Sequence, residues 1–336
     1  MRSRRLLLVT PSFHGYHRSI ARAFAGRGYD VVTHCYDGFE TFPDKLRNKA
    51  CFELPARLGF DGHTQAEAWA TRRALTVLRQ SRPDRVVVIK GDTLGNEFWH
   101  DLGERRTPRI LWLYDDLRRH RYTDEFLRDV GPIVSYARIE AQQLCERGIQ
   151  TTFVPNAFDP DLASPSARRS GEIVFVGARY PNRVDLLTRL GEAGVPVRAY
   201  GRQWSHHFFD RLRTWELARP SVPAERDIPL DRAYAVQAEA AAAVNVHGSQ
   251  AGLAMRTFEV PGMGGLQLAD RQDIGEFYEV GKEVLVFDSA AELVDLAVRA
   301  QRDHVWSERI REAGRRRSLA HHTFAHRIAE VDALWA

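Results

Sequence analysis

The segment that decides the fold is residues 240–265, which read AAAAVNVHGSQAGLAMRTFEVPGMGG. Its apolar run at 242–247 predicts a buried strand, and a loop with two glycines connects this strand to a helix at 255–262. A second apolar run at 265–268 predicts another strand directly after that helix. Because strand, helix and strand in this order form the unit of a parallel sheet, the segment indicates an α/β fold.

The same alternation extends over both halves of the chain. In the first half, strands are expected at residues 5–10, 30–34, 85–90, 109–114, 132–135 and 152–154. In the second half, they are expected at residues 172–176, 197–200, 242–247, 265–268 and 283–287. A stretch rich in Pro, Ser and Asn at 155–171 separates the halves and is the candidate linker. We therefore expect two Rossmann-like domains, at 1–160 and 171–320.

Length and composition favour a compact protein with two domains. The 336 residues are 44% hydrophobic and 27% charged, and no apolar run approaches the ~18 residues of a membrane-spanning helix. The basic N-terminus has an apolar run too short for a signal peptide, and three cysteines are too few for a disulfide framework, so we expect a cytoplasmic protein with reduced thiols. The net charge of +4 is too small to indicate a nucleic-acid partner. A surplus of basic residues in the first half suits an anionic substrate or a membrane surface.

The helix of the deciding segment begins with charged side chains. Arg256 and Glu259 are spaced so that they lie one turn apart on one face. Amides at a helix start attract a phosphate, the arginine adds charged hydrogen bonds, and the glutamate can accept from ribose hydroxyls, so a nucleoside diphosphate satisfies all three. The alternative is a structural pair in which Glu259 only complements the helix dipole. The candidate donor-binding residues here are His247, Gly248, Arg256, Thr257 and Glu259.

A second group of candidates follows the first two strands of the second domain. The loop after the strand at 172–176 carries two arginines and leads into a helix, where a donor diphosphate could lie. These arginines could stabilise a leaving group that departs with negative charge, or they could belong to a solvated turn. Trp204, after the next strand, could pack in the core or receive a base. The candidate residues of this group are Arg179, Asn182, Arg183 and Arg202.

The first domain supplies the candidates for chemistry. His14 and the candidate donor-binding residue Gly15 lie in the loop that joins the first strand to the first helix, where a histidine could act as a base, bind a donor phosphate or simply be exposed. The loop lacks the Gly-x-Gly-x-x-Gly pattern of dinucleotide oxidoreductases. Asp115 and Asp116 end another strand at the same edge of the sheet. Because adjacent carboxylates point to different sides, we expect only one to face a reacting sugar, with Asp115 preferred as base or acceptor-orienting group.

Several runs of sequence together resemble a known family. These runs are RTFEVPGMGG at 256–265, DIGEFYEVGKE at 273–283, IVFVGARYPNR at 173–183, LWLYDDL at 111–117 and residues 152–160. They resemble the spore maturation protein CgeB family of GT-B glycosyltransferases over most of residues 85–330. The resemblance implies two facing Rossmann-like domains, with an acceptor domain first and a nucleotide-sugar donor domain second. It also implies that the terminal helix at 321–336 crosses back to the first domain.

The resemblance also assigns roles to individual residues. Glu259 matches the glutamate that holds the nucleotide ribose in related retaining enzymes. Those enzymes often have a second acid eight residues earlier, where this chain has Ala251. Loop amides at 248–252 would then have to contact the donor sugar, and the motif leaves a retaining or an inverting mechanism open.

We therefore expect a glycosyltransferase that moves a sugar from a nucleotide donor, with UDP or TDP as the expected nucleotide, to a hydroxyl acceptor in the interdomain cleft. The acceptor could be a glycan, a natural product, a lipid or a protein. No cofactor and no essential metal are expected, because His322 and His326 lack a third ligand and are interpreted as a solvated helix face. The alternatives are a nucleotide-sugar epimerase of the same fold and a non-catalytic sugar-nucleotide-binding protein of a surface-assembly complex.

Overall fold

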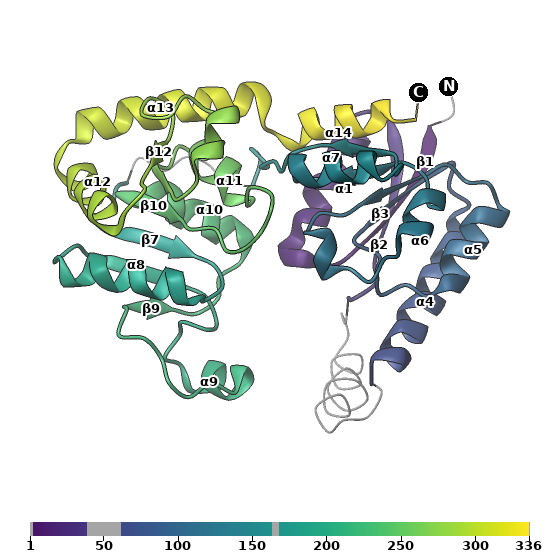
Figure 1. Ribbon diagram of the computed structural model, residues 1–336, viewed down its shortest axis with the longest axis horizontal. Helices are drawn as coiled ribbons and strands as arrows, with labels where there is room; N and C mark the ends of the chain where they lie inside the picture. Colours follow the sequence, from purple (N-terminus) through teal and green to yellow (C-terminus); the bar gives the residue numbers. More distant parts are fainter. Residues whose placement is uncertain (1–2, 39–61, 163–167, 336) are drawn as a thin grey trace. The chain divides into compact units, whose positions relative to one another are not determined.

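The computed structural model describes residues 3–38, 62–162 and 168–335. The chain divides into two compact units (Figure 1). Unit 1 contains Met1–Pro155 and Phe324–Ala336, and unit 2 contains Asn156–Thr323. The boundary thus lies between Pro155 and Asn156, at the start of the stretch expected to be a linker.

Unit 1 is built on a parallel six-stranded sheet with the strand order β2-β1-β3-β4-β5-β6. Its strands are β1 (Arg4–Thr10), β2 (Tyr29–Cys35), β3 (Arg85–Ile89), β4 (Arg109–Trp112), β5 (Ile133–Ser135) and β6 (Thr151–Phe153). The central strands are continuous apolar runs: Leu6, Leu7 and Leu8 of β1 are fully buried. Such runs are expected where helices cover both faces of a parallel sheet.

The helices of unit 1 alternate with these strands. They are α1 (Tyr16–Ala25), α4 (Gly62–Ser81), α5 (Asn96–Glu104), α6 (Asp124–Asp129) and α7 (Arg138–Glu146). The terminal helix α14 (Phe324–Ala333) packs against α1 in the same unit, and Figure 1 shows the two helices close together. The expectation that the last helix returns to the first domain is therefore confirmed.

The terminal helix α14 packs through an apolar stripe. Phe324, Ile328 and Val331 are at most 3% exposed. The ring centroid of Phe324 lies 6.4 Å from that of Tyr16 in α1. At the end of the helix, Asp332 forms ion pairs with Arg27 and Arg85 of unit 1. Apolar burial and paired charges together attach this distant part of the chain to unit 1.

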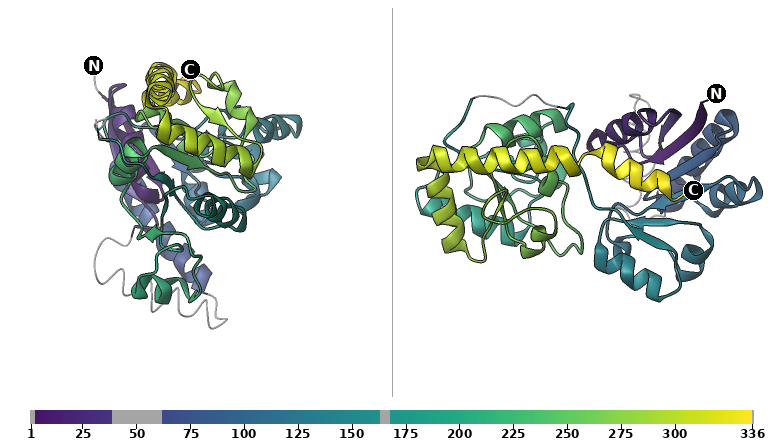
Figure 2. Two further views of the ribbon diagram at one scale, coloured as in Figure 1. Left: turned by 90° about the vertical axis from the view of Figure 1, so that its left-hand side faces the viewer. Right: turned by 90° about the horizontal axis from the view of Figure 1, so that it is seen from above.

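Unit 2 is a second parallel six-stranded sheet, with the strand order β12-β11-β10-β7-β8-β9. Its strands are β7 (Ile173–Val176), β8 (Val197–Tyr200), β9 (Ala224–Glu225), β10 (Ala242–Asn245), β11 (Gln267–Ala269) and β12 (Leu285–Val286). Its helices are α8 (Pro181–Glu192), α9 (Phe208–Thr214), α10 (Leu230–Glu239), α11 (Arg256–Gly262), α12 (Ala290–Arg302) and α13 (His304–His321). Figure 2 shows α13 lying along one side of unit 2, where it packs against α11.

The close packing of α11 in unit 2 depends on glycines. A Cβ atom at Gly262 would approach the ring of Phe158 to 2.6 Å, and one at Gly314 of α13 would approach the carbonyl oxygen of Glu283 to 2.4 Å. Both distances are shorter than any real Cβ contact. Phe158 is fully buried in this core, so residues just after the boundary are packed into unit 2. Among the described residues, no helix has the length and apolar character needed to cross a bilayer.

His34 in β2 makes unit 1 sensitive to acid. Burial, together with the charge of Arg73, lowers the pKa of His34 from 6.5 to about 4. The unfolded chain therefore binds a proton as the pH falls from about 6.5 to about 4 while the folded chain does not, so the stability of unit 1 falls over this range. The contribution is at most about 3 kcal/mol. We expect His34→Val to remove it, measured as the change in unfolding free energy between pH 7 and pH 4.5.

His100 provides the control for this prediction, because it lies in the same unit with its side chain 75% exposed. We expect His100→Val to leave the pH dependence of stability as it is in the original protein. Equal pH profiles for the original protein and His34→Val would contradict the prediction.

Candidate functional site

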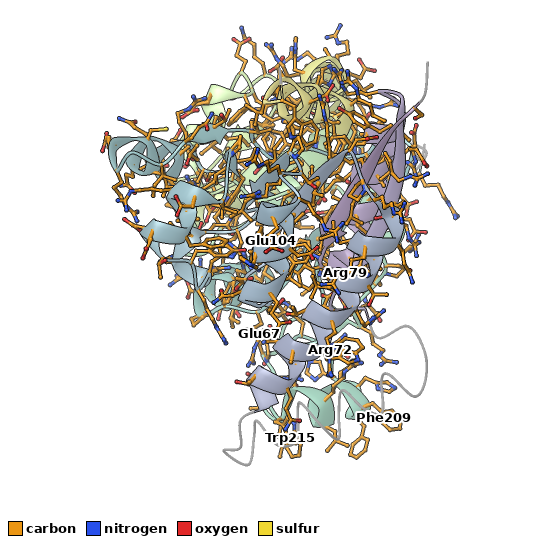
Figure 3. The ribbon with its side chains drawn as sticks, turned by 90° about the vertical axis from the view of Figure 1, so that its right-hand side faces the viewer. Glu67, Arg72, Arg79, Glu104, Phe209 and Trp215 are labelled. Atoms are coloured by element: carbon orange, nitrogen blue, oxygen red, sulfur yellow. The ribbon has the colours of Figure 1, made fainter. Side chains whose placement is uncertain are left out.

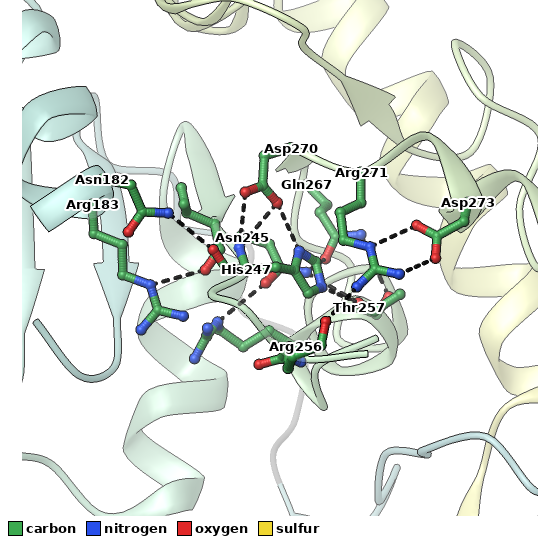
Figure 4. A network of polar contacts seen from close by, with 12 residues as sticks. Asn182, Arg183, Asn245, His247, Arg256, Thr257, Gln267, Asp270, Arg271 and Asp273 are labelled. Carbon is green, nitrogen blue, oxygen red and sulfur yellow. Dashed lines mark hydrogen bonds and ion pairs between the residues drawn. The ribbon is translucent and has the colours of Figure 1, made fainter. Parts of the chain in front are cut away.

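The candidate site of unit 2 lies at the carboxyl ends of β7, β10 and β11. Because these strands are parallel neighbours, their carboxyl ends meet at one edge of the sheet. The loop 246–255 joins β10 to α11 at this edge, and α8 begins close to it. Figure 4 shows the polar network that the strand ends, the loop and the two helices form together. Ligands of open α/β sheets bind at this kind of edge.

Two arginines are central to this network. Arg183 of α8 is 3% exposed and donates from Nε to the Val246 carbonyl at 2.9 Å and from Nη1 to the Ala178 carbonyl at 2.8 Å. Arg256 donates from Nη1 to the Val176 carbonyl at 2.9 Å. Burial and the nearby charge of Arg256 lower the pKa of Arg183 to about 10, so it still carries its charge at neutral pH. Two cations thus lie close together in a partly buried place, which favours binding of an anion.

The ring of Phe175 from β7 supports both arginines. Its centroid lies 5.2 Å from the Arg183 guanidinium carbon and 5.4 Å from that of Arg256. Tyr180 contacts Arg183 in the same way at 4.6 Å. The aromatic faces attract the cations while the carbonyls fix their directions. Arg183 is therefore a buried, oriented group, and its interpretation as part of a solvated turn is wrong.

A buried histidine and a carboxylate connect β10 to β11. His247 is 2% exposed, and its Nδ1 lies 2.7 Å from Oδ1 of Asp270. The backbone amide of His247 donates to both oxygens of the same carboxylate at 3.0 Å. Burial lowers the pKa of His247, although Asp270 opposes this shift, so the ring is neutral at pH 7. Asp270 therefore fixes both the backbone and the ring of His247 at the start of the loop.

Arg271 holds the next part of the same loop. Its Nη1 donates to the carbonyl of Gln250 at 3.1 Å, and its Nη2 donates to that of Ala251 at 3.1 Å. The Asp273 carboxylate accepts two hydrogen bonds from the same guanidinium. Figure 4 shows Arg271 and Asp273 on the far side of His247 from Asn182 and Arg183. Because one cation binds two successive carbonyls, the loop is held in one conformation beside the strand ends.

A polar layer below the loop fixes the start of α11. Asn245, fully buried at the end of β10, donates from Nδ2 to Oγ1 of Thr257 at 3.1 Å and to Oε1 of Gln267 at 3.3 Å. Arg256 donates from Nε to Oδ1 of the same asparagine at 3.3 Å. Glu259 lies in the first turn of α11 and is 3% exposed. Hydrogen bonds of the Asn245 side chain thus hold the first turn of α11 at the end of β10, although Asn245 and Thr257 are twelve residues apart in the sequence.

The structure brings together six of the donor-binding candidates predicted for unit 2. These are Asn182, Arg183, His247, Gly248, Arg256 and Thr257. Arg179 and Arg202 are instead directed to acids: Arg179 pairs with Glu216 at 2.7 Å, and Arg202 lies 3.5 Å from Asp227. Trp204 is fully buried and donates to the Gly177 carbonyl, so it packs in the core.

In unit 1, strained backbone marks the carboxyl edge of the sheet. His14, Lys90 and Tyr114 have φ values of 48°, 61° and 58° and follow β1, β3 and β4. Residues other than glycine rarely adopt this left-handed backbone region, and residues with such a strained backbone cluster at functional sites. His14 is exposed and precedes Gly15 at the start of α1, where a glycine with φ of 91° allows the turn. The edge of the sheet that carries the predicted catalytic residues thus contains three residues with a strained backbone.

The two aspartates after β4 have different surroundings. Asp115 is partly exposed and pairs with Lys90 at 3.3 Å and with Arg119 at 3.2 Å. Asp116 is 1% exposed, accepts from the Tyr136 hydroxyl at 2.6 Å and pairs with an arginine, so it fixes the backbone here. The structure therefore leaves Asp115 as the carboxylate that a ligand can reach. Lys90 was not predicted, although its place at the end of β3 is a signal that could have found it.

The two terminal histidines do not form the solvated face expected of them. His322 is 6% exposed, and its ring lies 5.2 Å from Phe258 and 5.1 Å from Tyr278. It packs in unit 2 because α13 ends against α11 there. Within the described parts of the chain, no group of three or more His, Cys, Asp or Glu side chains is arranged to hold a metal ion.

Comparisons with known proteins bear on this arrangement. Residues 181–333 match the family described as Glycosyl transferase-like. The matched region begins at α8 and includes the loop 246–255, α11 and β11. No protein with a curated function matches the chain in sequence.

The fold is similar to that of several solved structures. Sucrose-phosphate synthase from Thermosynechococcus elongatus has a TM-score of 0.67 at 14% identity, with 99% of this chain and 98% of that chain covered. A glycosyltransferase from Rickettsia africae has a TM-score of 0.63 at 10% identity, covering 99% and 98%. Anabaena HepE in complex with UDP and glucose has a TM-score of 0.61 at 11% identity, covering 98% and 99%. These likenesses confirm the GT-B fold expected from the sequence.

Proposed function

We propose that the protein is a glycosyltransferase that transfers a sugar from a nucleoside-diphosphate-sugar donor to a hydroxyl acceptor. The glycosyl transferase-like match at 181–333 and the GT-B fold support this proposal. Structures of HepE are described with UDP and with UDP-glucose, which supports a nucleotide sugar as the partner here. UDP and TDP remain our first choices for the nucleotide.

The observation that carries the proposal is the pair of arginines at the strand ends of unit 2. Arg183 and Arg256 lie within electrostatic reach of each other, and both are oriented by backbone carbonyls. Their mutual repulsion disfavours the free state, and a doubly charged diphosphate between them would remove it. Cleavage of the bond to the sugar leaves further negative charge on that diphosphate, so the same groups stabilise the transition state more than the ground state.

We assign two other parts of unit 2 to the ribose and the sugar of the donor. Glu259 is assigned to the ribose hydroxyls. The loop at 248–252 is assigned to the sugar, because Arg271 binds its carbonyls and thereby fixes the directions of its amides. This loop would supply by its backbone what related enzymes supply with an acid at the position of Ala251. We assign no metal to the site, because the two arginines already neutralise the charge of a diphosphate. We also propose that the protein is cytoplasmic and that it belongs with the CgeB-like enzymes.

Acceptor binding is assigned to unit 1. Its carboxyl edge carries the strained residues His14 and Tyr114 and the reachable carboxylate of Asp115. We propose Asp115 as the group that orients the acceptor hydroxyl or accepts its proton, with His14 as the further candidate. Asp116 is assigned to the support of this loop.

A nucleotide panel followed by a transfer assay tests the proposal. A nucleotide that binds the folded protein raises its melting temperature by mass action, so UDP, TDP, ADP, GDP and CDP are compared first. The donor sugar of the best nucleotide is then incubated with and without candidate acceptors. Acceptor-dependent release of nucleoside diphosphate supports transfer. A new sugar nucleotide without acceptor indicates an epimerase, binding without turnover indicates a silent binding protein, and no shift with any nucleotide refutes all three.

Glu259 provides a sharp test of the donor site. We expect Glu259→Ala to weaken nucleotide binding about ten- to hundredfold, since a charged hydrogen bond to ribose contributes about 1.5–3 kcal/mol. Calorimetric titration of the folded variant measures this. Glu279→Ala is the matched control, because Glu279 is an exposed glutamate of the same unit that pairs with Lys282. Equal affinities of the two variants would remove Glu259 from the site.

A further inference from the structure

A cluster of exposed apolar side chains lies on the connection between β8 and β9 of unit 2. We call residues 206–217 the α9 tip, since α9 forms its centre. Its large apolar side chains are 51–76% exposed, and they are Phe208, Phe209, Leu212, Trp215 and Leu217. The other exposed large apolar residues of the described chain are isolated from one another in sequence. Contiguous exposed apolar surface of this kind marks an interaction site.

The shape of the α9 tip is convex. Figures 1 and 2 show α9 at the outer end of the connection that leaves the sheet after β8, away from the helices that cover the sheet. Figure 3 shows the side chains of Phe209 and Trp215 extending outward from this segment. Phe208 and Leu212 are four residues apart in α9, so they share one face of the helix. A protruding segment buries its apolar side chains most readily in a partner that can deform around it.

The charges of the α9 tip point to an anionic partner. Both of its acids are paired with arginines: Asp210 is 4% exposed and accepts two hydrogen bonds from Arg226, and Glu216 pairs with Arg179 and Arg219. Arg213, on the same helix, adds an exposed positive charge. Aromatic and leucine side chains flanked by arginine are the composition of segments that lie in the interface of an anionic membrane.

Strain in the backbone of the α9 tip supports a function for its aromatic end. Trp215 ends α9 with φ of 58°, in the left-handed region that a bulky side chain rarely adopts. A glycine would adopt this conformation without strain and is the usual residue at such a helix end. The chain nevertheless has a tryptophan here, and this residue is 69% exposed.

From the exposed apolar cluster, its convex shape and its outward positive charge, we propose that the α9 tip inserts into the interface of an anionic lipid bilayer and so anchors unit 2 to a membrane surface. The inference does not depend on glycosyl transfer, because it rests on the surface of unit 2 alone.

Vesicle binding by the full chain tests the proposal. We expect the protein to cosediment with vesicles of phosphatidylglycerol and phosphatidylcholine in equal parts, and to bind vesicles of phosphatidylcholine alone more weakly. Phe208→Ser with Phe209→Ser should lower the partition coefficient at least about tenfold, since each ring loses apolar burial. Arg213→Ala should lower it about fivefold on the anionic vesicles only.

Two further variants distinguish membrane insertion from a structural role. Trp215→Gly should lower partitioning while leaving the melting temperature unchanged or raised, because it relieves the strained backbone. Val305→Ser, at an isolated apolar residue that is 84% exposed, should leave partitioning unchanged. Failure of the full chain to bind anionic vesicles at low ionic strength overturns the proposal. Self-association that the phenylalanine variants abolish, without lipid binding, also overturns it and identifies a second copy as the partner.

Discussion

Replacing Arg183 by alanine is expected to lower the turnover of sugar transfer by about two to three orders of magnitude, as the loss of one positioned donor to a developing oxyanion does in other enzymes. The guanidinium is oriented by the Val246 and Ala178 carbonyls, so its charge is in place before the donor arrives. The measurement is kcat at saturating donor, alongside nucleotide affinity. A fall in kcat much larger than the fall in affinity would identify an interaction that strengthens in the transition state.

Two arginines serve as controls for this prediction. Arg189 lies on the same helix, is exposed and pairs with Asp185, and Arg316 is exposed on α13. Alanine at either position should leave kcat unchanged. Because Arg183 also binds backbone carbonyls, the melting temperature of its variant must be compared with that of the original protein. A folded Arg183→Ala variant with the kcat of these controls would show that Arg183 only supports the loop.

The double variant Phe324→Ala with Ile328→Ala is expected to destabilise unit 1 by at least about 4 kcal/mol. Both side chains are buried on α14, the helix that packs against α1 in unit 1, and each large-to-small change removes apolar burial and leaves a cavity. Hydrogen exchange followed by mass spectrometry should show loss of protection in α1 and β2 of unit 1. Protection in β7 and β10 of unit 2 should be unchanged.

Glu330→Ala is the matched control on the same helix. Glu330 is exposed and pairs with Arg327, so the substitution should change stability by less than about 1 kcal/mol. Equal loss of protection in both units after the double variant would show that α14 stabilises the whole chain and not unit 1 in particular.

The strands of both sheets could be predicted because a buried parallel strand is a continuous apolar run. Residues 5–10 and 197–200 coincide with β1 and β8 within one residue. The helix α10 was missed because it is buried on several sides, with Tyr234 and Gln237 both at most 2% exposed, so its sequence lacks a single apolar stripe. The strand β9 was missed because two residues after a proline carry no pattern.

The site residues that could be predicted lie in one continuous stretch of the chain or directly after a predicted strand. Arg256, Thr257 and His247 belong to the deciding segment, and Arg183 was found from its place after β7. Asp270 and Arg271 were missed because they are more than twenty residues beyond His247 in the sequence, and only the pairing of β10 with β11 brings them to the loop. Both directly follow the end of β11, so the rule that parallel strand ends meet could have found them.

The chemical role of a charged residue depends on partners that its neighbours in sequence do not reveal. Arg179 and Arg183 are four residues apart, yet one pairs with Glu216 and the other is buried against two carbonyls. Asp115 and Asp116 differ in the same way, since Tyr136 and Arg118 occupy the second carboxylate. Burial and partners decide these differences, and both are properties of the folded chain.

The return of α14 to unit 1 has a consequence for synthesis on the ribosome. Unit 2, residues 156–323, is continuous in the chain, whereas unit 1 lacks its last helix until those 168 residues have been made. At about 5–20 residues per second this delay is roughly 10–30 seconds. During this time the surface of α1 that α14 covers is open to solvent and to other nascent chains. Unit 1 thus begins to emerge first but is completed last. A chaperone that binds the nascent chain early would meet unit 1 at the uncovered surface of α1.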